Sequence, residues 1–144
     1  VKSITGSKVI KMFKDDDNKV VGISNISSGK LEIGNFFLLY GMQLLAGVAE
    51  GTETAPDVAF NVIPDYVRNG EFEFKANGTV LVPNTSNEVF FTEGKDIFKG
   101  LYVLDNPKVI KDQQSIEFNL EWGSNAPEKS YLKAILRGTS VIKS

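Results

Sequence analysis

The sequence predicts an all-β domain, an antiparallel β-sandwich with at most one short helix. Three observations lead to this prediction. Apolar and polar residues alternate over residues 116–122, an Asn77-Gly78 pair separates two apolar runs, and polar turn residues recur between short apolar runs elsewhere. Alternation with a period of two marks strands that have one buried face. Short strands at this spacing are typical of sandwiches and barrels.

The clearest strand covers residues 116–122. Its inward positions are Ile116, Phe118, Leu120 and Trp122. Side chains two residues apart in a strand share a face, so this strand is expected to be half-buried. A second strand is predicted at residues 131–137, with Lys133 and Arg137 pointing outward. Its inward positions are Leu132, Ala134 and Leu136.

A hairpin is predicted over residues 71–82, with its turn at Asn77-Gly78. A two-residue type I′ turn is the usual choice for this pair. In that register, however, charged residues of the first strand would lie opposite valines of the second. A three-residue loop that begins at Ala76 pairs Phe74 with Val80 and puts the apolar residues on one face. Because a one-residue slip exchanges the two faces, we expect the three-residue loop.

The run at residues 34–49 has two interpretations. Leu38, Met42 and Leu45 fit a helical stripe, but the three glycines of the run would each cost a helix about 1 kcal/mol relative to alanine. Its aromatic residues favour a strand. We expect a long, bent, largely buried strand, with a helix as the alternative. A short helical turn is expected at residues 64–69, because proline suits the first turn of a helix.

The rest of the chain completes one domain. Further strands are expected at residues 8–13, 20–26, 89–91 and 101–104. Turns are expected at residues 15–18, 27–29, 83–84, 93–94 and 105–107. The acidic stretch at residues 50–57 is expected to be a long loop rather than a linker. The length of 144 residues suits a single domain over residues 1–144.

Composition restricts the chemistry. The chain has no Cys and no His, so it has neither a Ser-His-Asp triad nor a zinc site built on thiolate or imidazole. Its 16 Lys and Arg against 18 Asp and Glu give a net charge of −2, which is unlike a nucleic-acid binder. The longest apolar stretch, residues 36–49, is too short to span a bilayer.

Three groups of residues are candidate sites. The run Asp15-Asp16-Asp17-Asn18 could bind calcium, but it lacks the EF-hand spacing and is interpreted as a solvated hairpin turn. Glu117 and Glu121 lie about 13 Å apart on one strand at 3.3 Å per residue, too far for a glycosidase pair unless another strand contributes. Trp122 could stack on a sugar, but its place in the alternation favours the core. We therefore predict no catalytic, cofactor-binding or metal-binding residue.

The C-terminal part has a distinctive layout of strands and turns. Pro107 is followed by the apolar pair Val109-Ile110, a polar turn, the alternating strand at residues 116–122 and a last strand that ends at Arg137-Gly138-Thr139. Over about residues 60–140 this layout resembles small jelly-roll-type β-sandwich structural proteins of bacteriophage particles. The resemblance implies a jelly-roll-like sandwich that assembles through protein–protein contacts and has no catalytic residues. The N-terminal third matches no pattern of this kind.

The expected function follows from these points. We expect a non-catalytic virion structural protein, such as a capsid vertex, decoration or fibre-base subunit, assembled in the host cytoplasm. Its expected partners are further copies of the chain and other virion structural proteins, and the loops at residues 50–57 and 123–129 are natural contact arms. The alternative is a carbohydrate-binding module of a bacterial surface protein or an enzyme. A carboxylate-only enzyme is the least favoured reading.

Overall fold

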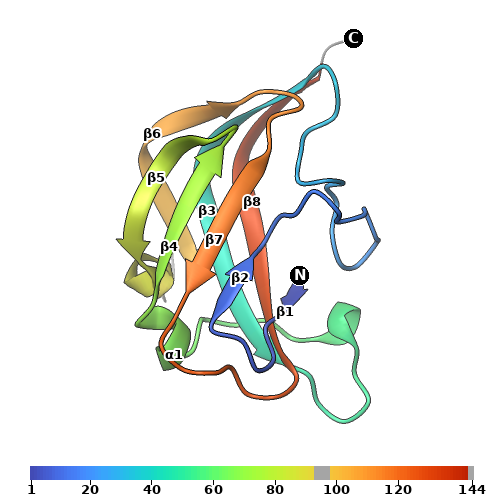
Figure 1. Cartoon of the computed structure of the whole chain (residues 1–144), viewed down its shortest axis with the longest axis vertical. Coiled ribbons are helices and arrows are strands. Elements are labelled where there is room, and N and C mark those ends of the chain that lie inside the picture. Colours follow the sequence, from blue (N-terminus) through green and yellow to red (C-terminus); the bar gives the residue numbers. More distant parts are fainter. Residues whose placement is uncertain (93–97, 143–144) are drawn as a thin grey trace.

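The chain folds into two four-stranded antiparallel sheets that pack face to face (Figure 1). The computed structural model describes residues 1–92 and 98–142. Its strands are β1 (Lys2–Ser3), β2 (Val9–Lys11), β3 (Asn35–Val48), β4 (Glu71–Ala76), β5 (Thr79–Ser86), β6 (Leu101–Ile110), β7 (Ile116–Glu121) and β8 (Ser130–Ile142). Within the described residues there is one short α-helix, α1 (Asp65–Arg68), and two 3-10 turns, η1 (Ala55–Asp57) and η2 (Asn87–Phe90). The predicted all-β sandwich is confirmed.

The strand order is that of a jelly roll. One sheet runs β1-β8-β3-β6 and the other β2-β7-β4-β5. The strands form four antiparallel pairs in which the two strand numbers add to nine: β1 with β8, β2 with β7, β3 with β6 and β4 with β5. This order results when one long folded-back ribbon is rolled into two layers. The jelly-roll form expected from the sequence is therefore present.

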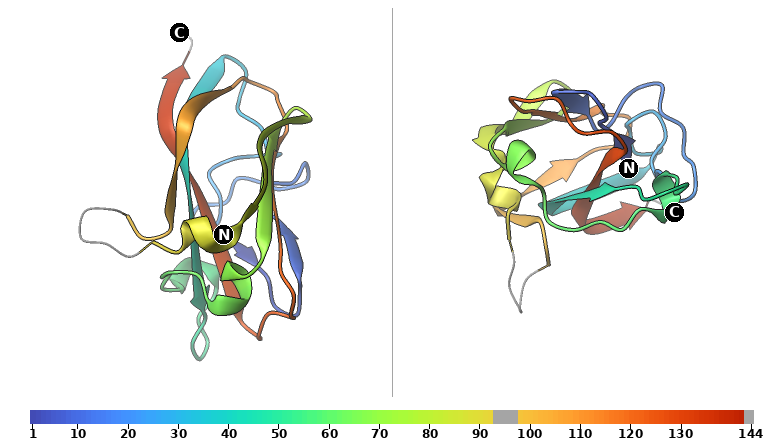
Figure 2. Two further views of the ribbon diagram at one scale, coloured as in Figure 1. Left: turned by 90° about the vertical axis from the view of Figure 1, so that its left-hand side faces the viewer. Right: turned by 90° about the horizontal axis from the view of Figure 1, so that it is seen from below.

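Aromatic side chains fill the space between the sheets. Phe118 of β7 lies beside Phe72 and Phe74 of β4 and Phe90 of η2, with ring centroids 5.6–5.9 Å apart. All four rings are fully buried. These separations are those of tilted and edge-to-face pairs, which stabilise a core beyond the area they bury. The two layers are seen edge-on in Figure 2.

The β4–β5 hairpin has a different register from the one predicted. Asn77 and Gly78 form a two-residue turn with φ values of 52° and 77°, so Ala76 pairs with Thr79. A register shift follows at once, and Phe74 then pairs with Val82. The predicted three-residue loop is wrong because an extra residue in β5, rather than a longer loop, returns the apolar residues to the inner face.

Segment 34–49 is a strand, as predicted, and not a helix. β3 pairs along its whole length with β8, and a bulge at Tyr40 bends it. Gly41 follows this bulge, and a Cβ there would lie 2.7 Å from the carbonyl oxygen of Tyr102. A glycine that would cost stability in a helix is therefore required by the close approach of β6.

Several shorter predictions need correction. Residues 20–26 are not a strand but a tight loop, in which Val20 and Ser24 exchange backbone hydrogen bonds around Gly22 at a φ of 87°. Residues 15–18 do turn, but they do not join two strands. Residues 89–91 belong mostly to η2, whose first turn is capped by the hydroxyl of Ser86. The turn at residues 27–29 and the helical turn at residues 64–69 are confirmed.

Two predicted turns lie inside strands. Residues 83–84 are part of β5, and residues 105–107 are part of β6, which extends far beyond the expected residues 101–104. Both are edge strands with register shifts, where proline needs no partner for its missing N–H. The strand expected at residues 8–13 is shorter, and the turn expected at residues 93–94 lies outside the described residues.

Candidate interaction surfaces

The outer face of the β2-β7-β4-β5 sheet is polar. The register sets Glu71 opposite Glu121, Glu73 opposite Asn119 and Lys75 opposite Glu117. Lys75 binds Glu73 at 3.1 Å, and this hydrogen bond raises the pKa of Lys75. The prediction that Glu117 and Glu121 belong to a solvent-facing polar row is confirmed.

Sequence reasoning missed one carboxylate pair on this face. Glu71 of β4 faces Glu121 of β7 in a shallow hollow lined also by Lys8, Ser86 and Trp122. A hydrogen bond with Glu121 is the main cause that raises the pKa of Glu71, followed by burial and the repulsion between the two carboxylates. The pairing of β4 with β7 brings these two carboxylates together, and the sequence alone did not predict the register of that pairing. Both carboxylates are exposed, so the pair is a surface feature and carries no assigned chemistry.

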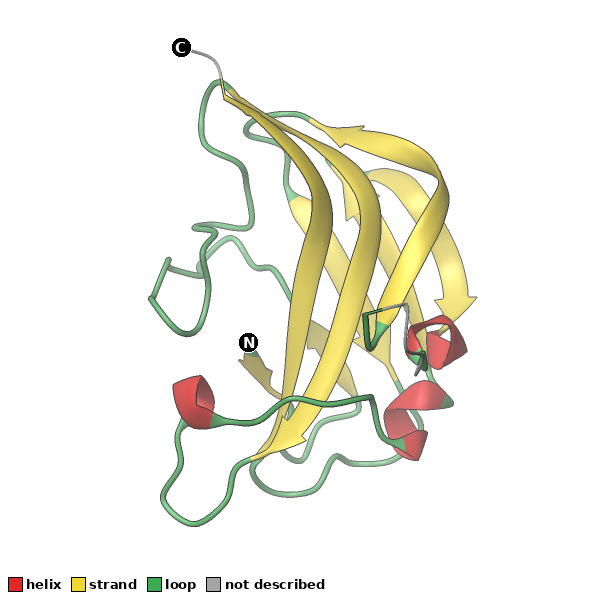
Figure 3. Ribbon diagram, turned by 180° about the vertical axis from the view of Figure 1, so that it is seen from behind, coloured by secondary structure: helices red, strands yellow, loops and turns green. Residues whose placement is uncertain are grey.

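The outer face of the β1-β8-β3-β6 sheet carries apolar side chains where β3, β6 and β8 adjoin; Figure 3 looks onto this side of the sheet. We define the apolar face as Phe36, Leu38, Tyr40, Val103, Val109 and Val141. Phe36 of β3 pairs with Val141 of β8, and Leu38 pairs with Val109 of β6, so these side chains adjoin. Val103, Val109 and Val141 are each more than half exposed. No described element packs on this part of the sheet, so its apolar side chains meet solvent.

A hydrogen-bonded cluster borders the apolar face. Gln43 is buried on the same outer surface, where its amide donates to the carbonyl oxygen of Lys99 at 2.7 Å. Arg137 donates twice to the Gln43 side-chain oxygen, at 2.7 and 3.1 Å, and stacks on the ring of Phe98 at 5.2 Å. Phe98 and Lys99 thus lie against the outer surface at Gln43 and Arg137, beside the apolar face.

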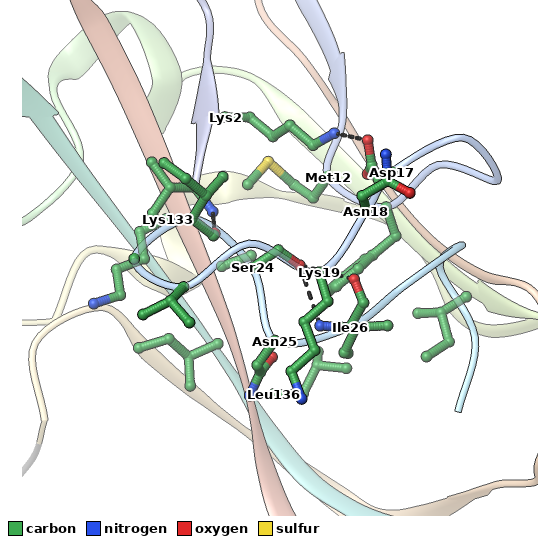
Figure 4. A pocket seen from close by; sticks show the side chains of 18 of the residues that line it. Lys2, Met12, Asp17, Asn18, Lys19, Ser24, Asn25, Ile26, Lys133 and Leu136 are labelled. Carbon is green, nitrogen blue, oxygen red and sulfur yellow. Dashed lines mark hydrogen bonds and ion pairs between the residues drawn. The ribbon is translucent and has the colours of Figure 1, made fainter. Parts of the chain in front are cut away.

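A cavity of about 780 Å³ lies at one edge of the sandwich (Figure 4). We call it the edge slot. Its inner wall is residues 133–136 of β8, its outer wall is the connection between β2 and β3, and Met12, Ile110 and Ile116 of the core form its floor. Consecutive side chains of a strand point to opposite faces, so a cavity that touches four residues in a row lies along the edge of β8.

The edge slot has a cationic rim. Lys2 forms an ion pair with Asp17 at 2.5 Å, but Lys19 and Lys133 have no carboxylate within ion-pair distance in the described part of the chain. Burial, and next the charges of Lys2 and Lys133, lower the pKa of the Val1 amine beside them. On a chain of net charge −2, this is a local concentration of positive charge.

Trp122 belongs to the core, as predicted. It is only 6% exposed, its indole N–H donates to the carbonyl oxygen of Ser7 at 2.9 Å, and its ring meets Tyr66 edge-on at 6.2 Å. A tryptophan held in this way has no free face for a sugar ring. The carbohydrate alternative thereby loses the platform on which it depended.

The acidic run at residues 15–18 is taken up by local contacts. Asp17 accepts a hydrogen bond from the backbone N–H of Lys14 at 2.9 Å and pairs with Lys2, whereas Asp15 and Asp16 point into solvent. Residues 1–92 and 98–142 contain no group of three acidic side chains placed to hold a metal. The run therefore anchors the β2–β3 connection to the start of the chain.

The two expected contact arms lie at one end of the sandwich. Residues 123–129 form a loop, and residues 50–57 form a loop that ends in η1. Lys129 of the first segment donates to the carbonyl oxygen of Gly51 in the second at 3.0 Å. No helix in the described residues is long and apolar enough to cross a bilayer. Comparison of the chain with protein-family models, curated proteins and solved structures finds no match.

Proposed function

We propose that this chain is a non-catalytic structural protein of a bacteriophage virion, a capsid vertex, decoration or fibre-base subunit that acts through protein–protein contacts. It would assemble in the host cytoplasm with further copies of itself and with other virion structural proteins. The observation on which this proposal rests is the apolar face.

An uncovered apolar sheet face favours a role in assembly. The outer faces of the two sheets differ sharply: one presents glutamates, a lysine and an asparagine, and the other presents Phe36, Leu38, Val109 and their neighbours. Contiguous apolar patches on a soluble domain mark sites of interaction with other proteins. The aromatic residues Phe36 and Tyr40 are also of the type that is enriched at interface cores.

The jelly roll is compatible with this role but does not by itself specify it. The same two-sheet roll serves viral capsid subunits, lectins and cupins, so function has to be argued from its surfaces. Here the fold gives a rigid scaffold, and the loops at residues 50–57 and 123–129 extend from one end of it. A subunit with one apolar face and one polar face is suited to pack in one orientation within an assembly.

The test is the assembly state of the protein and of two matched variants. Val109→Asp with Val141→Asp places two charges in the apolar face, whereas Val80→Asp changes a valine that is 46% exposed at the β4–β5 hairpin. Sedimentation across a range of concentrations should give a defined oligomer for the native chain and for Val80→Asp. The double variant should sediment as a monomer with an unchanged far-UV circular dichroism spectrum.

Particle imaging tests the virion assignment separately. An antibody raised against the chain should label purified particles at a fixed position in electron micrographs. A native chain that is strictly monomeric at all concentrations, together with particles that carry no label, would refute the proposal.

A further inference from the structure

The edges of the sandwich differ in how they are protected. β5 and β6 each carry a proline and register shifts, and β1 and β2 are two and three residues long. Short edge strands, prolines and bulges are the means by which proteins prevent their edges from pairing with other chains. β8 is different: β1 covers it only at Tyr131 and Leu132, and no described strand pairs with that side beyond Leu132.

The backbone of β8 presents hydrogen-bonding groups to the edge slot. Ser130 uses its N–H and C=O on the β1 side, where its N–H donates to the Thr5 hydroxyl and its C=O accepts from Ile4. Backbone groups two residues apart in a strand point to the same side. Ala134 and Leu136 therefore direct their N–H and C=O groups into the slot that they line.

The walls of the edge slot define what would fit there. A strand laid beside β8 would turn alternate side chains toward the apolar floor at Met12, Ile110 and Ile116. The side chains in between would face the rim, where Lys19 and Lys133 lack carboxylate partners among the described residues. Backbone pairing gives affinity in this mode of recognition, and alternate side chains give specificity.

We propose that the edge slot binds an extended segment of a partner protein, in which apolar and acidic residues alternate, as an additional strand beside β8. This inference goes beyond the proposed function, which rests on the apolar face of the same sheet. It requires a linear segment, not a folded surface, from the partner. It also applies whether or not the chain self-associates.

A binding experiment with designed peptides tests the inference. The probe is a fluorescent peptide of alternating valine and glutamate, as long as the uncovered part of β8, titrated with the full chain and followed by anisotropy. One control peptide has lysine in place of glutamate. Another keeps the sequence but carries N-methyl groups on the alternate amides that would pair with β8. We expect binding of the first peptide only.

Variants of the chain locate the site. Lys19→Glu with Lys133→Glu should weaken binding of the acidic peptide by roughly tenfold or more, because like charges then face each other at the rim. Lys11→Glu, at an exposed lysine of β2 that does not line the slot, should leave it unchanged. Amide hydrogen exchange at Ala134 and Leu136 of the native chain should slow when the peptide is bound. This measurement needs no variant, so it tests the site on β8 even if a variant folds poorly.

Several results would overturn the inference. These are no binding of the acidic peptide, equal binding of the N-methylated or lysine peptide, or unaltered exchange at Ala134 and Leu136. Binding of a long-chain fatty acid in the slot without binding of the peptide would also overturn it. Because the Val109 and Val141 variants leave the slot intact, loss of self-association and loss of peptide binding are separable.

Discussion

Replacement of Trp122 gives the most decisive test of its role. Trp122→Ala removes a ring that is 6% exposed, its edge contact with Tyr66 and its hydrogen bond to the carbonyl oxygen of Ser7. Truncation of a buried tryptophan costs about 3–5 kcal/mol through lost transfer energy and the cavity left behind. Trp122→Phe retains most of the apolar contact but loses the indole N–H, so we expect a smaller cost of about 1–3 kcal/mol.

The free energy of unfolding of each variant follows from urea titrations monitored by far-UV circular dichroism. Phe98→Ala is the matched control, since Phe98 is 63% exposed and its ring lies against the Arg137 guanidinium. We expect that control to cost less than about 1 kcal/mol. If Trp122 were a surface platform, its removal would change stability by no more than about 0.5 kcal/mol. Such a result would refute the assignment of Trp122 to the core.

Two further changes probe the polar sheet. The raised pKa of Glu71 beside Glu121 means that folding favours the protonated carboxyl, so its stabilising contribution is complete below the ordinary value of 4.5 and is lost as pH rises through the folded value. Glu71→Gln should therefore raise the melting temperature at neutral pH and have little effect at acidic pH, and an equal gain at both pH values would contradict this. Gly70→Ala would place a Cβ 2.1 Å from the carbonyl oxygen of Glu121, so urea titration should show a loss of about 1–3 kcal/mol. Gly123→Ala, which meets nothing within 4 Å, should be nearly neutral in the same titration, and equal losses would rule out the steric account.

Local patterns predicted the strands whose two faces differ in polarity. The alternation at residues 116–122 corresponds to β7 and to Trp122, which follows it and is buried. The glycines of residues 34–49 correctly favoured a strand over the helical alternative. Both results depend on information within the segment itself. A half-buried strand shows its period directly, and the cost of glycine in a helix is a local property.

The predictions that were wrong depend on how a segment pairs with neighbouring strands. Residues 105–107 have strong turn propensity, but β6 is an edge strand, where a proline and a bulge are accommodated without ending the strand. The hairpin register depends on a bulge in β5, and the residues of the turn do not predict that bulge.

The apolar face was missed for a related reason. The apolar run at residues 34–49 predicted a largely buried strand, whereas the structure leaves Tyr40 43% exposed and the outer side chains around it partly exposed. A sequence shows that a residue is apolar, but it does not show whether a second layer covers it. The edge slot could not be predicted from the sequence either. Its walls come from β8 and from the β2–β3 connection, which lie about a hundred residues apart in the chain.

The pairing of strands whose numbers add to nine has a kinetic consequence. β4 and β5 can join through a two-residue turn, but each further pair encloses all the pairs before it, and β1 meets β8 only when the rest is in place. Pairings between distant segments form slowly because loop closure must precede their contacts. We therefore expect the roll to close from β4–β5 outward and to open in the reverse order. Hydrogen exchange should find the Ile4 amide, bonded to the Ser130 carbonyl, less protected than the amides of β4. Each such opening of β1 would expose Tyr131 and Leu132 and lengthen the free edge of β8.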